Sequence, residues 1–280
     1  MIGTLLDEMA EARRQRQPHC LITIAATQGS VPRRAGTKML VYSDGKITGT
    51  VGGGRFESLV IADAIALHGQ RDPVLKSYPL HDTATDSFGA ICGGEVTVLI
   101  EPQLPSPTLT LVGAGHCSRA LAHLAQTCGW HVTVIDDRVE AVADFPARER
   151  LSSPRAPDFI AAKSWRNDDA LVLVNRNYQL DRDALAAALK NRGMAYLGMM
   201  GSRRKVRRVL DELLASGFQK TDFAGLRAPI GLDLGADHPA EIAVSIFAEI
   251  LLVFHQTSGR PLLLLESLPS NPAAHELIPV

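Results

Sequence analysis

The chain has 280 residues, of which 46% are apolar and 21% are charged, and its formal net charge is −1. This length and composition suit two globular domains with separate cores and exclude a mostly disordered protein. The 29 basic and 30 acidic residues are interspersed, so no net field attracts nucleic acid or an anionic membrane surface. Neither nucleic acid nor a membrane is therefore expected as a partner.

The N-terminal residues have leucine and methionine at helical spacing and lack the order of a secretory signal, so we expect a cytoplasmic protein. The longest apolar stretch, residues 242–254, contains Glu249 and is shorter than the roughly 20 residues of a membrane-spanning helix. It predicts a buried helix. The cysteines lie far apart without a Cys-x-x-Cys pair, which favours free thiols: Cys20, Cys92, Cys117 and Cys128.

Residues 1–104 are predicted to form a small N-terminal α/β domain. Apolar spacing predicts one helix over about residues 2–16 and another from Phe56 to Leu67. Asp44 and Gly45 favour a hairpin turn between two strands. The expected strands cover residues 20–26, 38–42, 46–50, 74–80 and 95–101.

Pro102, Pro105 and Pro107 mark a domain boundary, because proline lacks the backbone donor that a helix or sheet uses. Residues 105–280 then alternate apolar strands with amphipathic helices, the pattern of a Rossmann-like, doubly wound parallel sheet. A closing helix is expected from Pro239, since proline tolerates the first turn. The other elements are strands near 108–112, 131–135, 170–174 and 195–198, and helices near 116–128, 180–190 and 202–216.

A nucleotide-binding glycine pattern follows the first strand of the second domain. Gly113 and Gly115 allow a sharp turn and bring amides near a pyrophosphate at the start of the next helix, where His116 would touch the ligand. Asp136 follows Gly115 by 21 residues, which suits hydrogen bonds to ribose hydroxyls. Ser118 replaces the third glycine and departs from the standard pattern. The alternative interpretation is that the glycines form only a tight turn, without any ligand.

Two further loops of the second domain carry polar groups. Ser202 is placed to cap a helix whose first turn begins with Arg203 and holds three cations, which oppose the helix dipole. An anion bound beside Gly201 would relieve this conflict, and a solvated run of charge is the alternative. The other loop carries groups expected to face the same cleft: Asp233, Asp237 and His238.

A second glycine loop lies before the second helix of the first domain. Gly52, Gly53 and Gly54 expose backbone amides with no side chains in the way, which suits a phosphate or another oxyanion, and Arg33 adds positive charge. Glu57 is expected in the first turn of the helix, where negative charge suits the dipole.

Small residues flank Cys92, including Gly93, and leave its sulfur approachable. A thiol is a soft ligand, suited to a soft metal centre or to sulfur transfer. For a single cysteine, the alternative is a small buried apolar residue.

The order of these motifs resembles the XdhC/CoxI family, whose members are accessory proteins of xanthine dehydrogenase and related molybdenum hydroxylases. The resemblance covers nearly the whole chain and rests on several spaced motifs. They are GSVPRRAG at 29–36, GTVGGGRFE at 49–57, CGGEV at 92–96, GAGH at 113–116, LGMMGSRRK at 197–205, PIGLD at 229–233 and AEIA at 240–243.

The resemblance implies a chaperone that binds molybdenum cofactor (molybdopterin), protects it, favours the form with a terminal sulfido ligand and inserts it into the large subunit of xanthine dehydrogenase. It implies a place in purine catabolism, a cysteine desulfurase as sulfur donor, and no substrate turnover, with low-level oxidoreductase activity left open. Many relatives have a cysteine where this chain has Arg55. Cys92 is then the main thiol candidate, as a molybdenum ligand or a sulfur relay, while glycine amides and arginines hold the cofactor's phosphate.

Two other functions stay open. An NAD-dependent oxidoreductase would use Cys92 or His116 for chemistry, and it would prefer NAD over NADP because Asp136 and Asp137 repel a 2′-phosphate. A nucleotide-sensing regulator would bind nucleotide in the second domain without chemistry. A homodimer is consistent with the sequence, since closed two-fold symmetry is the commonest arrangement of soluble oligomers.

Overall fold

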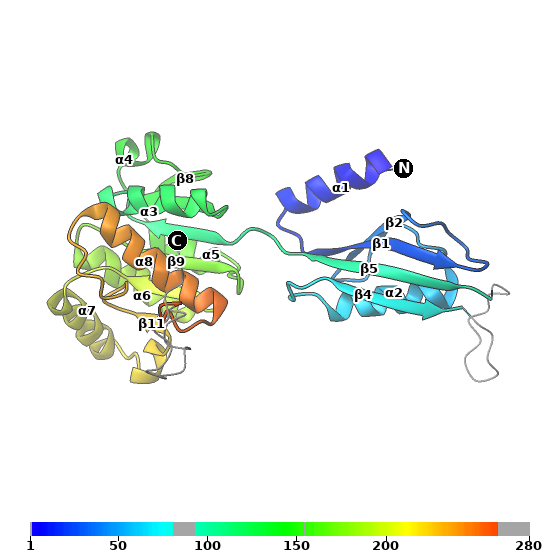
Figure 1. Cartoon of the computed structure of the whole chain (residues 1–280). Coiled ribbons are helices and arrows are strands. Elements are labelled where there is room, and N and C mark those ends of the chain that lie inside the picture. The colour runs from blue at the N-terminus through cyan, green and yellow to red at the C-terminus, as the bar shows by residue number, and fades with distance from the viewer. Residues whose placement is uncertain (1, 81–92, 154, 263–280) are drawn as a thin grey trace, which may run out of the picture. The chain divides into compact units, whose positions relative to one another are not determined.

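The computed structural model describes residues 2–80, 93–153 and 155–262 of the chain (Figure 1). The chain divides into two compact units, Met1–Ser106 and Pro107–Val280. Within the described residues, no helix combines the length and the apolar run that crossing a membrane requires.

The first unit is built on a five-stranded antiparallel sheet with the order β3-β2-β1-β5-β4. The hairpin expected at Asp44 and Gly45 joins β2 to β3, and Gly45 has a φ of 82°. Every predicted helix and strand of this unit is present, with each end within two residues of its prediction. The elements are α1 (Ile2–Arg14), β1 (His19–Gln28), β2 (Lys38–Tyr42), β3 (Ile47–Gly49), α2 (Gly54–Ala66), β4 (Val74–Pro79) and β5 (Glu95–Gln103).

The two helices of the first unit cover opposite faces of its sheet (Figure 1). Successive side chains of a strand point to opposite faces, and β2 shows this period. Leu40 and Tyr42 pack in the core beneath α1, whereas Met39 and Val41 pack in the core beneath α2. A sheet buried on both faces explains why β2 is apolar at successive positions rather than alternating.

The second unit contains a six-stranded parallel sheet with the order β11-β10-β9-β6-β7-β8. The predicted fold class is confirmed: α/β, with a small N-terminal α/β part and a Rossmann-like parallel sheet. Strands β8 and β11 were not predicted, because both are short and largely exposed and carry no apolar pattern. The strands are β6 (Thr108–Val112), β7 (His131–Asp136), β8 (Glu149–Ser152), β9 (Asp169–Leu173), β10 (Tyr196–Met199) and β11 (Leu226–Arg227).

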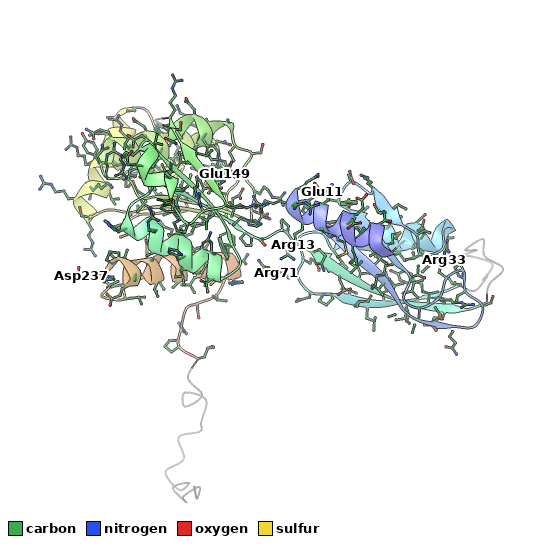
Figure 2. The ribbon with its side chains drawn as sticks, turned by 90° about the horizontal axis from the view of Figure 1, so that it is seen from above. Glu11, Arg13, Arg33, Arg71, Glu149 and Asp237 are labelled. Atoms are coloured by element: carbon green, nitrogen blue, oxygen red, sulfur yellow. The ribbon has the colours of Figure 1, made fainter. Side chains whose placement is uncertain are left out.

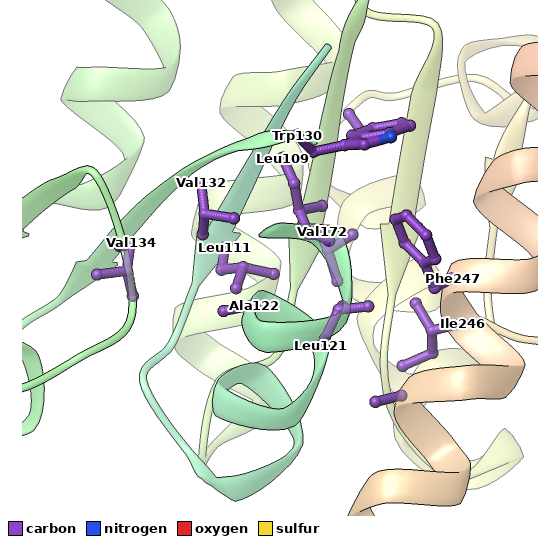
Figure 3. Close-up of a cluster of buried hydrophobic side chains, with 14 of the residues drawn as sticks. Leu109, Leu111, Leu121, Ala122, Trp130, Val132, Val134, Val172, Ile246 and Phe247 are labelled. Atoms are coloured by element: carbon purple, nitrogen blue, oxygen red, sulfur yellow. The ribbon is translucent and has the colours of Figure 1, made fainter. Parts of the chain in front are cut away.

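Helices pack on both faces of this sheet. On one face, Leu121 of α3 and Phe247 of α8 pack against strand residues such as Leu109 and Leu111 (Figure 3). The opposite face packs against α5, α6 and α7. The helices are α3 (His116–Thr127), α4 (Val139–Ala143), α5 (Ala156–Ala162), α6 (Tyr178–Lys190), α7 (Arg203–Ala215) and α8 (Pro239–His255), with a 3₁₀ turn at Lys220–Phe223.

The apolar stretch predicted as a buried helix is α8, and the structure explains the acidic residue inside it. Glu249 accepts a hydrogen bond from the Tyr196 hydroxyl at 2.6 Å and another from the backbone N–H of Gly231 at 2.9 Å. The Glu249 carboxylate therefore ties α8 to β10 and to the loop that precedes the helix.

The sheet order of the second unit brings several loops to one edge. Strand β6 lies between β9 and β7, so the chain leaves β6 toward one side and later returns to the other. The carboxyl ends of parallel strands at such a switch point form the usual ligand-binding edge of this class of sheet. The residues after β6, β7, β9 and β10 all lie there.

Candidate functional site

The glycine loop of the first unit is closed over a carboxylate of the chain itself. Glu57, in the first turn of α2, accepts hydrogen bonds through Oε2 from the backbone N–H of Val51 at 3.0 Å and of Gly53 at 3.2 Å. The Thr50 hydroxyl donates to the same oxygen, and the backbone N–H of Gly52 donates to the Thr50 oxygen at 3.1 Å. Of the three amides predicted to hold an external oxyanion, the amide of Gly53 therefore bonds to this internal carboxylate and the amide of Gly52 bonds to Thr50.

These hydrogen bonds favour the charged form of Glu57. Burial on its own would raise the pKa of this carboxyl group, but the bonds from Thr50 and from the backbone of residues 51–53 outweigh burial, and the pKa lies below its ordinary value. No salt bridge joins Glu57 to a cation within the described part of the chain. Among the described residues, its charge is thus held by neutral donors.

Close packing of neighbouring segments leaves no room for a side chain at Gly52 or at Gly94. A Cβ added at Gly52 would lie 2.7 Å from Cγ of Pro32, and one added at Gly94 would lie 2.4 Å from the carbonyl oxygen of Ser30. Both distances are shorter than side-chain carbons tolerate, so the neighbouring loops require glycine at these two positions.

The predicted thiol, Cys92, lies outside the described residues, and its role stays a prediction. Gly93, the next residue, is exposed. The other three cysteines carry free thiols. Cys20 is buried in the first unit, donates to the Ala64 carbonyl at 3.3 Å, and has its pKa raised to about 11 by burial, so it is a packing residue.

A pocket of about 680 Å³ lies beside the glycine loop within the first unit. Its walls come from α1, from the segment that leads into β2, and from β3 with the residue after it. Arg33, which the sequence analysis singled out, belongs to that segment (Figure 2). The lining residues are Thr4, Leu5, Arg33, Ala35, Gly36, Thr37, Lys38, Thr48, Gly49 and Thr50.

The glycine loop of the second unit makes the expected sharp turn after β6. Gly113 has a φ of 112°, and an added Cβ would lie 2.5 Å from the carbonyl oxygen of Val174, so only glycine fits. Gly115 is the N-cap of α3, and exposed His116 begins the helix. Ser118, at the place of the third glycine, is fully buried, and its hydroxyl has no hydrogen-bond partner in the described structure.

Asp136 lies next to this loop, but both of its oxygens already have partners. One oxygen accepts the backbone N–H of Ala114 at 2.7 Å and a guanidinium N–H of Arg138 at 2.8 Å. The other accepts the Arg138 Nε–H at 2.8 Å and its backbone N–H at 3.0 Å. Burial would raise the pKa of Asp136, yet the bonds from Arg138 and Ala114 hold that pKa far below its ordinary value. A ribose would have to displace Arg138.

The neighbouring aspartate is also paired. Asp137 accepts a bidentate pair of hydrogen bonds from Arg176, at 2.6 and 2.7 Å, and these bonds lower its pKa. Neither Arg138 nor Arg176 was predicted as a partner of these aspartates. Arg138 stands two residues after Asp136 and could have been noticed, whereas Arg176 follows a different strand and reaches Asp137 only through the sheet order.

The basic loop after β10 is neutralised in part. Ser202 caps α7 as predicted, accepting the backbone N–H of Lys205 at 3.2 Å. Lys205 turns inward, forms an ion pair with fully buried Asp181 and donates to the Met200 carbonyl at 3.1 Å. An added Cβ at Gly201 would lie 2.7 Å from Cδ of Lys205, so this lysine packs over the loop.

Two cations of that loop face solvent. Arg203 and Arg204 are exposed and take part in no ion pair within the described part of the chain. Anion binding beside Gly201 and a solvated run of charge therefore both remain compatible with this loop. In the third predicted loop, His238 is the N-cap of α8 and accepts the backbone N–H of Ala240 at 3.3 Å.

The structure thus gathers the described site predictions into two groups, one in each unit. The first group combines the glycine loop with Arg33, and the second combines the loops after β6, β7 and β10. No group of three or more histidine, cysteine, aspartate or glutamate side chains forms a metal site among the residues described.

Comparisons with known proteins match both units. A family model described as the XdhC and CoxI family matches residues 12–79, and one described as the XdhC Rossmann domain matches residues 109–250. The protein YqeB of Escherichia coli (strain K12) is 36% identical over 278 residues, covering 98% of this chain and 50% of that protein.

Two relatives have functional names. A probable xanthine dehydrogenase subunit from Bacillus subtilis (strain 168) is 33% identical over 149 residues, covering 52% of this chain and 43% of that protein. The molybdenum cofactor insertion chaperone PaoD of Escherichia coli (strain K12) is 24% identical over 288 residues, covering 90% of this chain and 89% of that protein. The chain thus spans about half the length of YqeB and less than half of the Bacillus protein.

Proposed function

The chain belongs to the XdhC and CoxI family, and on that premise we propose that it is an accessory chaperone that binds molybdenum cofactor and delivers it to a xanthine dehydrogenase or a related molybdenum hydroxylase. The observation that carries the proposal is the alignment with a molybdenum cofactor insertion chaperone over nearly the whole of both chains. Such a role needs binding and release of the cofactor and no substrate turnover.

The proposal extends to how the cofactor is handled. We propose that the chaperone shields the cofactor, holds it while a cysteine desulfurase supplies the terminal sulfur, and inserts it into the large subunit of the dehydrogenase. Cys92 is the proposed molybdenum ligand or sulfur relay, since a thiolate is a soft ligand for such a centre. The dithiolene of the pterin would hold molybdenum in transit, and the protein would bind the pterin and its phosphate.

An NAD-dependent oxidoreductase is less well supported. The carboxylate that would bind the ribose, Asp136, has both oxygens occupied by Ala114 and Arg138. Rossmann-like sheets also occur in proteins without dehydrogenase activity, so fold alone does not favour this function.

The test is the molybdenum and pterin content of the protein purified without oxygen from a cofactor-producing host. We expect near-stoichiometric cofactor in the wild type and its loss in Cys92→Ala, with Cys128→Ala as the control because Cys128 is an exposed thiol of the second unit. The loaded wild type should restore activity to a cofactor-free dehydrogenase. A wild type without cofactor, and with measurable hydride transfer to or from NAD, would replace this proposal with the oxidoreductase.

A further inference from the structure

We propose that the pocket between α1 and β3 is where the first unit holds a flat heteroaromatic ligand that carries a phosphate, with Arg33 as the phosphate partner. The inference deepens the proposed function and rests on it, because a pterin with a phosphate tail belongs to this chemical class. The ligand's phosphate would then lie beside Arg33 and not at the amides of the glycine loop.

The size and walls of the pocket suit a small organic ligand. Its volume of about 680 Å³ lies within the range of ordinary small-molecule sites. The pocket is mostly apolar, and Leu5 of α1, which is only 5% exposed, forms part of the wall. All of the lining residues belong to the first unit.

One wall of the pocket is bare backbone. Gly49 has a φ of 88°, and a Cβ added there would lie 2.9 Å from the Lys38 carbonyl oxygen and 3.6 Å from Cδ1 of Leu5. Gly36, also with a φ of 88°, has no heavy atom within 4 Å of an added Cβ. Backbone and aliphatic surface without protruding side chains is the kind of surface on which a planar ring can lie.

Arg33 is the cation available at this pocket. It is exposed and has no hydrogen bond or ion pair within the described chain. The other cation of the lining, Lys38, donates to the Thr23 hydroxyl at 2.8 Å. A guanidinium presents donors in a fork that matches two phosphate oxygens, so Arg33 suits the charged end of the ligand.

The glycine loop is a poorer phosphate site than Arg33. The amides of Val51 and Gly53 already bond to the Glu57 carboxylate. A phosphate placed there would have to expel this carboxylate and would meet its negative charge at close range. Glu57 therefore acts as a fixed internal anion that shapes the loop beside the pocket.

The experiment measures pterin and molybdenum per chain in two variants and two matched controls, each made in the full chain and purified without oxygen. Arg33→Glu reverses the proposed phosphate partner, and Arg34→Glu is its control, since Arg34 is the adjacent exposed arginine outside the lining. Thr4→Trp fills the pocket from α1, and Leu6→Trp is its control, since Leu6 is 58% exposed and outside the lining.

We expect Arg33→Glu and Thr4→Trp each to lower the bound pterin by about tenfold or more, the loss that removal of one charge-assisted contact or of the ring's space produces. Both controls should stay within about twofold of the wild type. Melting curves by circular dichroism should be the same for all four variants, because every substituted side chain is exposed. Wild-type cofactor content in both pocket variants would overturn the pocket while leaving the chaperone function intact.

A wild type that carries no pterin would count against the chaperone function, and the pocket is then tested separately. The same ligand chemistry occurs in nucleotides, so flavin mononucleotide and guanosine monophosphate are titrated into the wild type and the four variants by calorimetry. Binding that weakens about tenfold in Arg33→Glu and Thr4→Trp would show that the pocket binds a nucleotide. No binding of either probe, or equal binding in all of these proteins, would overturn it.

Discussion

Each unit of the chain has a glycine loop before a helix, and in both units a carboxylate of the chain accepts hydrogen bonds from the loop amides. In the first unit Glu57 is held by the Thr50 hydroxyl and by backbone amides, with no cation among the described residues. In the second unit Asp136 is held by one loop amide and, in addition, by the guanidinium of Arg138. In both glycine loops, backbone amides are thus hydrogen-bonded to a carboxylate of the protein itself: two amides in the first unit and one in the second.

The two loops differ in the donors that hold their carboxylates, and so in how firmly each carboxylate is held. Neutralising a carboxylate that is held by neutral donors costs less folding free energy than neutralising a buried carboxylate that also pairs with a cation. The Asp136 side chain is 4% exposed and that of Arg138 is 40% exposed, so their ion pair is largely shielded from water on one side. We therefore expect the loop of the second unit to resist opening by acid more than the loop of the first unit does.

Substitution of Asp136 should have the largest effect. Asp136→Asn removes the charge that holds Arg138 and weakens the bond from the Ala114 amide, and we expect a loss of about 3 kcal/mol in the free energy of unfolding of the second unit. Asp137→Asn is the control, because Asp137 pairs with Arg176 near the surface, where an ion pair contributes little. Urea denaturation of the two variants measures both losses, and equal losses would contradict the proposed difference.

Substitution of Glu57 should have a smaller effect, confined to the first unit. Glu57→Gln keeps the shape of the side chain but weakens the bonds from Val51 and Gly53, which should cost about 1–2 kcal/mol. Faster hydrogen exchange of those two amides, with Ala114 unchanged, is the expected observation. Ser58→Ala, on the exposed side of the same helix, serves as the control. Unchanged exchange at Val51 and Gly53 would show that Glu57 does not close the loop.

Acid should open the two loops in a fixed order. Both carboxyl groups have a pKa lowered by folding, so each stabilises the folded state fully above its unfolded pKa, about 4.3 for glutamate and 3.9 for aspartate. That stabilisation is lost as pH falls through the folded value. Because folding lowers the pKa of Asp136 further than that of Glu57, carboxyl carbon chemical shifts should show Glu57 protonating first as the pH is lowered. Protonation of Asp136 before Glu57 would contradict the expected difference between the two loops.

The smallest expected effect is a difference in nucleotide affinity, because the Asp136 carboxylate that would bind the ribose already accepts hydrogen bonds from Arg138. We expect NAD to bind weakly and NADP more weakly still, since Asp136 and Asp137 repel a 2′-phosphate. Calorimetric titration of the full chain with each dinucleotide measures the order. Tighter binding of NADP would mean that Arg138 and Arg176, rather than the two aspartates, meet the ribose.

The secondary structure of the first unit could be predicted closely because its signals are local. The strand at Lys38–Tyr42 and the glycine turn at Gly45 are read from neighbouring residues, and both agree with the structure. Strand β8 was missed because its residues are mostly exposed and its pairing with β7 comes from tertiary contact. A local residue pattern predicts helices and strands, but it does not say which distant strands will pair.

The candidate site could be predicted only in part. Gly113 and Ser202 have the structural roles that their positions in the sequence suggested, a sharp turn and a helix cap. The inward turn of Lys205 to Asp181 was not predicted, because the two residues lie on different helices that pack side by side only in the folded unit. The residue types of a site can be read from the sequence, but ion pairs across helices cannot.

Residue types and their spacing were enough to predict the class of this protein: an α/β chain with two glycine loops, a Rossmann-like second part and the ordered motifs of the XdhC and CoxI family. These features depend on residue type and spacing along the chain, which the sequence states directly. The bonds from the loop amides to Glu57 and Asp136, and the pocket beside Arg33, are seen only in the folded chain. Hydrogen-bond partners and empty volume depend on distances between segments, and folding alone sets those distances.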